Sequence, residues 1–211
     1  MNEKQEQEKH VIDQLAHAAA EILLQDNAEA DIDSQKLLTA ACDYVVLEWE
    51  KHVGRKPEEA DQCQVIPAAI AAAHAFLLQQ TNGLGLLYTF GYMDVCADAV
   101  IAQLVALDVV IVDIRYSPNS RRAKWRMARL QEQLGEHCLS IRELGNVNYN
   151  QPGTPIQLFQ SENGVNLVGE RLQRGQHLAL MCVCREVEEC HRLEAARQVQ
   201  AQFPDVILIH L

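Results

Sequence analysis

The first third of the chain has the spacing of amphipathic helices. Apolar residues recur in steps of three and four at Ile12, Leu15, Ala19 and Ile22. This is the period of one helix face. The same reasoning predicts helices over residues 34–52 and 65–80, and the turn-forming run at 81–85 ends the segment. Residues 1–82 are therefore expected to form a helical extension of about three helices.

Beyond residue 85 the pattern changes to short apolar runs that alternate with helical segments. Five runs indicate strands, at 86–90, 109–114, 138–141, 177–182 and 206–209. Helices are expected between them, at 95–107, 121–134, 164–173 and 189–202. Because the runs are almost wholly apolar, the strands should be buried on both faces. We predict an α/β domain over residues 86–211, with a mainly parallel, Rossmann-like sheet of about five strands and helices on both faces.

Length and composition fit a soluble protein. The chain has 211 residues, 48% of them hydrophobic, which is enough for one core and a second small one. The longest apolar stretch, at 68–78, is too short to span a bilayer, and residues 1–10 lack a secretory signal. Seven cysteines, an odd number, favour free thiols in a reducing compartment. We therefore expect a cytoplasmic protein without a membrane contact.

The net charge of −11 is concentrated at the front of the chain. Residues 1–85 carry 15 acidic and 6 basic side chains, whereas residues 86–211 carry 14 and 12. Residues 115–129 contain no acid and are locally positive. On the helix expected there, one face carries Arg122, Trp125, Arg126 and Arg129. This face is either simply solvated or a surface that binds nucleic acid, with the indole stacking on bases.

Polar residues follow four of the five predicted strands. The carboxyl ends of parallel strands share one edge of the sheet, so these residues should meet in a pocket. They are Thr89, Gly91 and Tyr92 after the first strand, Asp113, Arg115, Ser117 and Ser120 after the second, Arg142 and Glu143 after the third, and Cys182, Cys184 and Arg185 after the fourth. The loop at 145–163 is long enough to cover such a site.

An anionic ligand is one occupant that this pocket suggests. Ser120 and Arg121 stand at the expected helix start, where hydroxyl, guanidinium and backbone N–H groups can hold a phosphate. The proposed ligand contacts are Arg115, Ser120, Arg121, Cys182, Cys190, Arg192 and Tyr92. Two other interpretations stay open: Ser120 as an ordinary helix N-cap, and Arg115 in a structural ion pair with Asp113.

Acid–base chemistry is a further possibility. Asp113 and Glu143 are the candidate catalytic carboxylates for a hydrolase-type reaction, such as cleavage of an N-glycosidic bond. His191 is a third candidate, as a proton carrier near neutral pH.

The cysteine-rich segment after the fourth strand allows two kinds of thiol chemistry. Cys182, Cys184, Cys190 and His191 are residue types that bind zinc. Their spacing is not a common zinc motif, and adjacent Cys190 and His191 should point in different directions on a helix. We therefore predict no cofactor and keep zinc as the lesser alternative. A reactive thiol beside Arg185 and Arg192 competes with buried, inert cysteine.

Several of these residues match the motifs of a known family. The run Asp113-Ile114-Arg115-Tyr116-Ser117-Pro118-Asn119-Ser120-Arg121, then Glu143-Leu144-Gly145, Cys182 and Cys190-His191-Arg192 resemble the D-x-R-x-x-P-x-S-R, E-L-G and C-x7-C-H-R signatures of the domain of unknown function 488 (DUF488) family. The resemblance covers residues 86–211 and implies a compact Rossmann-like α/β domain with no settled reaction. The family's T-I-G-H-S is replaced by Thr89-Phe90-Gly91-Tyr92-Met93. Cys184 and Asn146 also depart from the pattern.

Three functions therefore remain in view. The first is binding, with or without hydrolysis, of a phosphate-bearing ligand that resembles a nucleotide or nucleic acid. The second is a non-catalytic ligand-sensing or interaction module, with residues 1–82 recruiting a partner or forming a homodimer. The third is nucleic-acid binding through the basic face defined above.

Overall fold

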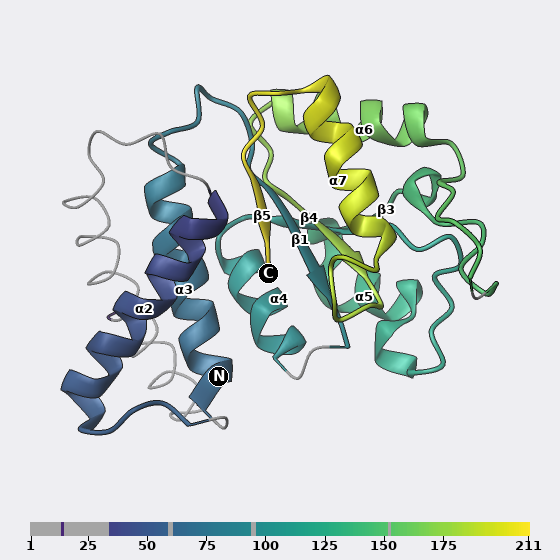
Figure 1. The fold of residues 1–211 in the computed structure, drawn as a ribbon. Coiled ribbons are helices and arrows are strands. Elements are labelled where there is room, and N and C mark those ends of the chain that lie inside the picture. The colour runs from purple at the N-terminus through teal and green to yellow at the C-terminus, as the bar shows by residue number, and fades with distance from the viewer. Residues whose placement is uncertain (1–13, 15–33, 59–60, 94–95, 152) are drawn as a thin grey trace. The chain divides into compact units, whose positions relative to one another are not determined.

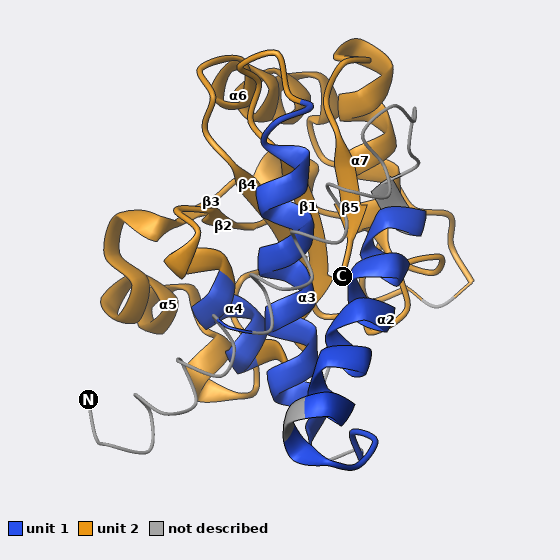
Figure 2. Ribbon diagram, turned by 90° about the vertical axis from the view of Figure 1, so that its left-hand side faces the viewer, with its two compact units in different colours: residues 1–80, 98–103 blue, residues 81–97, 104–211 orange. Residues whose placement is uncertain are grey.

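The chain divides into two compact units, which are described separately. The computed structural model describes Gln14 and residues 34–58, 61–93, 96–151 and 153–211. One unit comprises residues 1–80 and 98–103, and the other comprises residues 81–97 and 104–211 (Figure 2). Apart from Gln14, the helix predicted around residues 12–22 lies outside the described residues.

The first unit is helical, and it contains the helical pair α2 (Ser34–Val53) and α3 (Gln62–Leu77). The sequence pattern predicts both helices, the second about three residues late at each end. A column of buried residues spaced four apart, Leu37, Ala41, Val45 and Trp49, forms the apolar face of α2. Small buried side chains on α3, such as Ala69 and Ala73, let helices approach closely.

The second unit is an α/β fold with a five-stranded sheet that is parallel throughout (Figure 1). The strands are β1 (Leu87–Gly91), β2 (Val110–Asp113), β3 (Cys138–Ser140), β4 (Leu178–Cys182) and β5 (Leu208–His210). The helices that follow β1 to β4 are α4 (Ala97–Ala106), α5 (Met127–Leu134), α6 (Ser161–Gln173) and α7 (His191–Gln202), and residues 98–103 of α4 belong to the first unit. The predicted fold class is confirmed.

The strand order β3-β2-β4-β1-β5 creates a switch point at β4. From β1 to β3 the chain moves toward one edge of the sheet, and from β3 to β5 it moves toward the other. With right-handed connections, such a reversal moves the connecting helices to the opposite face. There α6 and α7 bury Val168 and Val199 in one core with Leu180 of β4. Ligands of open α/β sheets bind at such switch points, so the loop after β4 is well placed for a site.

Several predicted helix starts differ from the structure by two residues or more, and two of these differences affect the site. The helix predicted from residue 121 begins only at Met127, because Arg126 is extended (φ −77°, ψ 138°) and residues 123–125 form a separate 3-10 turn. The helix predicted from residue 189 begins at His191. Cys190 is its extended N-cap residue (φ −112°, ψ 140°).

The expected free thiols are found at five cysteines but not at the other two. Cys63 and Cys96 are disulfide-bonded. The free cysteines are Cys42, Cys138, Cys182, Cys184 and Cys190.

Within the described part of the chain, no helix combines the length and the apolar character that crossing a bilayer requires.

Candidate functional site

A cavity of about 390 Å³ opens at the carboxyl edge of the sheet, beside the end of β4. Three segments line it: Arg115, Tyr116 and Ser117 after β2, Asn146, Tyr149 and Ile156 from the long loop before α6, and Cys182, Val183, Cys184, Glu189 and His191 around the β4–α7 loop. The long loop that the sequence suggested as a cover does contribute to the cavity wall.

Asn146 organises the loop that carries Tyr149 and Ile156. Its side-chain oxygen accepts hydrogen bonds from the backbone N–H groups of Asn148 at 3.1 Å and Gln157 at 3.0 Å. Asn146 also forms an isolated antiparallel bridge with Leu158. These contacts close the loop into a compact turn, because they tie its two ends together.

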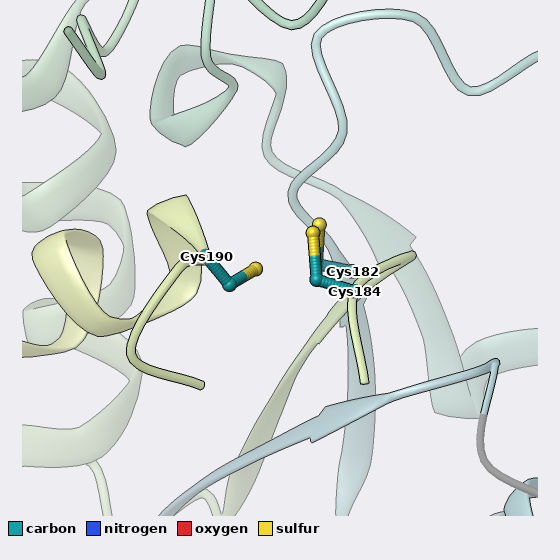
Figure 3. A group of neighbouring side chains, drawn as sticks. All are labelled: Cys182, Cys184 and Cys190. Atoms are coloured by element: carbon teal, nitrogen blue, oxygen red, sulfur yellow. The ribbon is translucent and has the colours of Figure 1, made fainter. Parts of the chain in front are cut away.

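Three cysteine thiols gather beside the end of β4 (Figure 3), and two of them, Cys182 and Cys184, line the cavity. The sulfurs of Cys182, Cys184 and Cys190 all lie within 4.8 Å of one another. Cys182 ends β4, Cys184 follows in the loop, and Cys190 caps α7. Because Cys190 is extended and not helical, its side chain turns toward the other two. The premise that Cys190 and His191 share a helix therefore does not hold, but among the described residues the cluster contains the three cysteines and not His191 of the predicted zinc set.

His191 joins Cys182 to the end of β2. Its Nε2 lies 3.1 Å from the backbone oxygen of Ile114, and its Nδ1 lies 3.5 Å from the Cys182 sulfur. Since a carbonyl can only accept, Nε2 carries the proton and donates to it. In neutral His191 the lone pair of Nδ1 is then directed at the Cys182 thiol.

The three thiols differ in acidity because they share hydrogen bonds. Hydrogen bonds from Cys182 and Cys190 lower the pKa of Cys184, helped by the charges of His191 and Arg192. The hydrogen bond with Cys184 raises the pKa of Cys182, and burial adds to this rise. Hydrogen bonds with Cys182 and Cys184, together with burial, likewise raise the pKa of Cys190. One thiolate, centred on Cys184, is therefore favoured in the cluster.

Arg192 holds the β4–α7 loop and does not face the cavity. Its side chain is 1% exposed. It donates to the backbone oxygen of Cys184 and, at 2.8 Å, to that of Arg185. A Cβ added to Gly91 would stand 1.8 Å from the same Cys184 oxygen, so only glycine admits the loop there. Gly91 and Arg192 thus fix the position of Cys184.

Asp113 and Arg115 form a buried ion pair. Arg115 Nε donates to Asp113 Oδ1 at 2.7 Å, and Nη2 donates to Oδ2 at 2.5 Å. The same guanidinium donates to the Trp125 backbone oxygen at 2.7 Å. Burial opposes the charge of Arg115, but its bonds to Asp113 outweigh that effect and raise its pKa. The geometry corresponds to the structural ion pair considered above, because both carboxylate oxygens are occupied.

The predicted phosphate site at Ser120 and Arg121 is not a helix N-terminus, since α5 starts at Met127. Ser120 Oγ instead accepts hydrogen bonds from Arg122 N at 3.1 Å and from Tyr92 OH at 3.3 Å. Arg121 is exposed, and Ser120, Arg121 and Tyr92 do not line the cavity. Of the predicted ligand set, Arg115 and Cys182 therefore line the cavity, whereas Ser120, Arg121 and Tyr92 are outside it.

Glu143 is also outside the cavity lining. It lies in the 3-10 turn Arg142–Leu144, where its backbone oxygen accepts from Gln160 N at 2.9 Å. The structure therefore does not bring the two predicted catalytic carboxylates together in the cavity. Of the three predicted catalytic residues, His191 alone lines it.

On the basic face at residues 122–129, the structure buries Trp125 and so favours packing of the indole over its exposure for base stacking. Trp125 is 2% exposed and stacks on Tyr92, with the ring centroids 4.7 Å apart. Its indole cannot stack on bases without leaving this position. Arg129 pairs with Glu132, and Arg126 Nε donates to the Ser120 backbone oxygen at 3.2 Å.

Sequence reasoning missed the aromatic wall of the cavity. Tyr116 packs edge-on against Phe159 at 5.4 Å, its ring lies 6.2 Å from that of Tyr149, and Arg142 lies 4.3 Å over it. The pattern of polar residues after the strands does not indicate that these tyrosines line the cavity. Gly145 offers one signal, since a Cβ there would stand 2.4 Å from Tyr116 N, so the glycine allows the two loops to touch.

Comparison with family models, with curated proteins and with solved structures gave no match. The resemblance to the DUF488 family remains a prediction that rests on the motifs quoted above.

Proposed function

We propose that the protein binds a small nucleotide-like ligand in the strand-end cavity and acts by binding it, without catalysing its hydrolysis. The observation that carries the proposal is the cavity itself, about 390 Å³ at the switch point of the sheet. This volume is within the range of small-molecule sites.

The lining supports a ligand with a planar, hydrogen-bonding part. Tyr116 and Tyr149 offer aromatic surface, and Ser117 and Asn146 add polar groups. Arg115 is the basic residue of the lining, and its charge is already balanced by Asp113. We therefore propose that the base-like part of the ligand enters the cavity and that its phosphate stays near the rim.

Binding without hydrolysis is proposed from the state of the two candidate catalytic carboxylates, Asp113 and Glu143. A general base needs a free lone pair within reach of the substrate. Both oxygens of Asp113 accept from Arg115, and Glu143 is outside the cavity lining. This arrangement favours a ligand-sensing module.

The test is a thermal-shift screen with nucleosides, their nucleotides and inorganic phosphate, because a ligand bound only by the folded state raises the apparent stability. At a ligand concentration of about 100 Kd the expected gain is about 2.7 kcal/mol. A nucleoside and its nucleotide should give similar shifts, and phosphate alone should give none.

Tyr149→Ala should remove most of the shift without unfolding the protein, because Tyr149 is 59% exposed. Leu167→Ala is the matched control, since Leu167 is an exposed apolar residue of α6 outside the cavity lining. An equal loss of shift in both variants, or a shift from phosphate alone, would exclude the proposed site.

A further inference from the structure

The cluster of Cys182, Cys184 and Cys190 has the geometry of a metal site. Two separate segments, the end of β4 with its loop and the cap of α7, bring the three sulfurs within 4.8 Å of one another. Figure 3 shows the Cys190 side chain pointing toward the other two. Zinc held by thiolates at about 2.3 Å in a tetrahedral site places its sulfurs roughly 3.8 Å apart. Only a small inward adjustment therefore separates this cluster from a coordination shell.

The surroundings of the three cysteines favour their thiolate form. Cys190 is the N-cap of a helix of 12 residues, and helix N-termini stabilise thiolates. The buried Arg192 binds the backbone oxygens of Cys184 and Arg185, and its Nε has no hydrogen-bond partner among the described residues. Its positive charge therefore lies beside the loop that carries Cys184, and no acidic side chain of the described residues is bound to it.

The position of the cluster makes an ion accessible. Cys184 is partly exposed, and both Cys182 and Cys184 line the cavity. An ion held by the three sulfurs would face this cavity, which leaves its fourth position to a water molecule or another small ligand. His191 supports Cys182 as a thiolate only when both ring nitrogens carry protons, because Nε2 then donates to the Ile114 carbonyl and Nδ1 to the sulfur.

We propose that Cys182, Cys184 and Cys190 bind one thiophilic metal ion as thiolates, with Zn²⁺ as the probe. Each cysteine that is still a thiol before binding releases its proton to solvent, so the affinity increases with pH. The proposal rests on the sulfur geometry and is independent of the proposed ligand. Softness of the donor set favours zinc or copper(I) over magnesium or calcium.

The experiment is a titration of the full-length protein, with its free thiols kept reduced, against Zn²⁺ in competition with a chromophoric chelator. The wild type should bind one equivalent. Cys184→Ser should bind zinc at least about 100-fold more weakly, since loss of a mere outer-shell partner already costs 10- to 100-fold. Cys42→Ser is the matched control, because Cys42 is also a free, partly buried cysteine but lies in α2.

A second measurement covers the case in which Cys184→Ser does not fold. Alkylation of the wild type with and without zinc, mapped by mass spectrometry, should show protection of Cys184, the partly exposed thiol of the cluster, and of no cysteine outside the cluster. Protection at cysteines outside the cluster would overturn the proposal. Equal zinc affinity in wild type and a folded Cys184→Ser, or no zinc uptake by the wild type, would also overturn it.

Discussion

At the residue scale, Asp113 shows how a motif residue can serve structure. Its carboxylate is fully buried and is bound by Arg115 through both oxygens. Removing one partner of a buried pair leaves the other charge uncompensated, at a cost of about 3–5 kcal/mol. Asp113→Asn should therefore lower the free energy of unfolding by about that amount, measured by urea denaturation.

The control for this prediction is an exposed ion pair. Arg129 and Glu132 also pair, but both side chains are more than 60% exposed. Glu132→Gln should change the stability by less than about 1 kcal/mol. If Asp113→Asn were as mild, the pair would not stabilise the fold and Asp113 would again be a candidate for catalysis.

Gly91 is the second residue whose type is dictated by a neighbour. A Cβ at this position would stand 1.8 Å from the Cys184 backbone oxygen, which cannot move aside as a flexible side chain could. Gly91→Ala should destabilise the protein by about 1–3 kcal/mol or more through overpacking, and should displace the β4–α7 loop.

Gly83→Ala is the control that distinguishes the steric clash at Gly91 from the general effect of replacing a glycine. Gly83 has a φ of +83° but no atom within 4 Å of an added Cβ, so its substitution costs only backbone strain. Thermal unfolding and the alkylation rate of Cys184 should distinguish Gly91→Ala from Gly83→Ala. Gly83→Ala should leave the Cys184 rate unchanged, and a change of equal size in both variants would contradict the packing argument.

At the element scale, two histidines at strand ends make the stability depend on pH. His177 precedes β4, and its Nδ1 accepts from Leu86 N at 2.9 Å. His210 in β5 pairs with Thr89 of β1 at 2.7 Å. Burial lowers the pKa of both histidines, and for His210 the charges of Arg192 and Arg197 lower it further.

The sign of the effect follows from proton linkage. Below the unfolded-state pKa of 6.5 the unfolded chain binds protons that folded His177 and His210 do not yet take up. The stability they provide is present above pH 6.5 and is lost as pH falls through the lowered values. Each histidine contributes at most about 1.4 kcal/mol per pH unit. Urea denaturation at pH 7.5, 6 and 5 should show this loss, and it should be smaller in His177→Gln. An unchanged slope would exclude His177 as a source.

The elements also show which features the sequence could predict. All five strands were found because each is a run of apolar residues, and β1 and β4 are buried at every position. The helix starts were missed because they depend on single backbone conformations. The extended Arg126 and Cys190 carry no sequence signal strong enough to end the helical pattern.

At the scale of the whole molecule, the site depends on strand order, which periodicity does not contain. The polar strand ends correctly indicated the carboxyl edge, and the cavity lies there. Only the placement of β4 between β1 and β2 makes its loop the centre of the site. Tyr149 and Ile156 reach the cavity through the folding of one long loop, so local patterns did not reveal them.

The thiols of the whole molecule should react in a defined order. At pH 7 iodoacetamide should modify Cys184 first, because its pKa is lowered by the hydrogen bonds from Cys182 and Cys190 and it is partly exposed. Cys42 should follow slowly, since burial and the neighbouring Asp43 raise its pKa to about 11. Cys138, whose pKa burial also raises to about 11, should react mainly through unfolding.

The pH dependence of alkylation tests the shared thiolate directly. Only the thiolate attacks iodoacetamide. When the pH is well below the pKa of a cysteine, its alkylation rate therefore falls about tenfold for each unit of decrease in pH. Between pH 8 and pH 6 the rate at Cys42 should therefore fall about 100-fold, whereas the rate at Cys184 should stay nearly constant because its thiolate persists. Cys182→Ala and Cys190→Ala should each raise the pKa of Cys184 by removing a donor, and so restore a pH-dependent rate. A wild-type Cys184 rate that falls in parallel with that of Cys42 would mean that the three sulfurs do not share a thiolate.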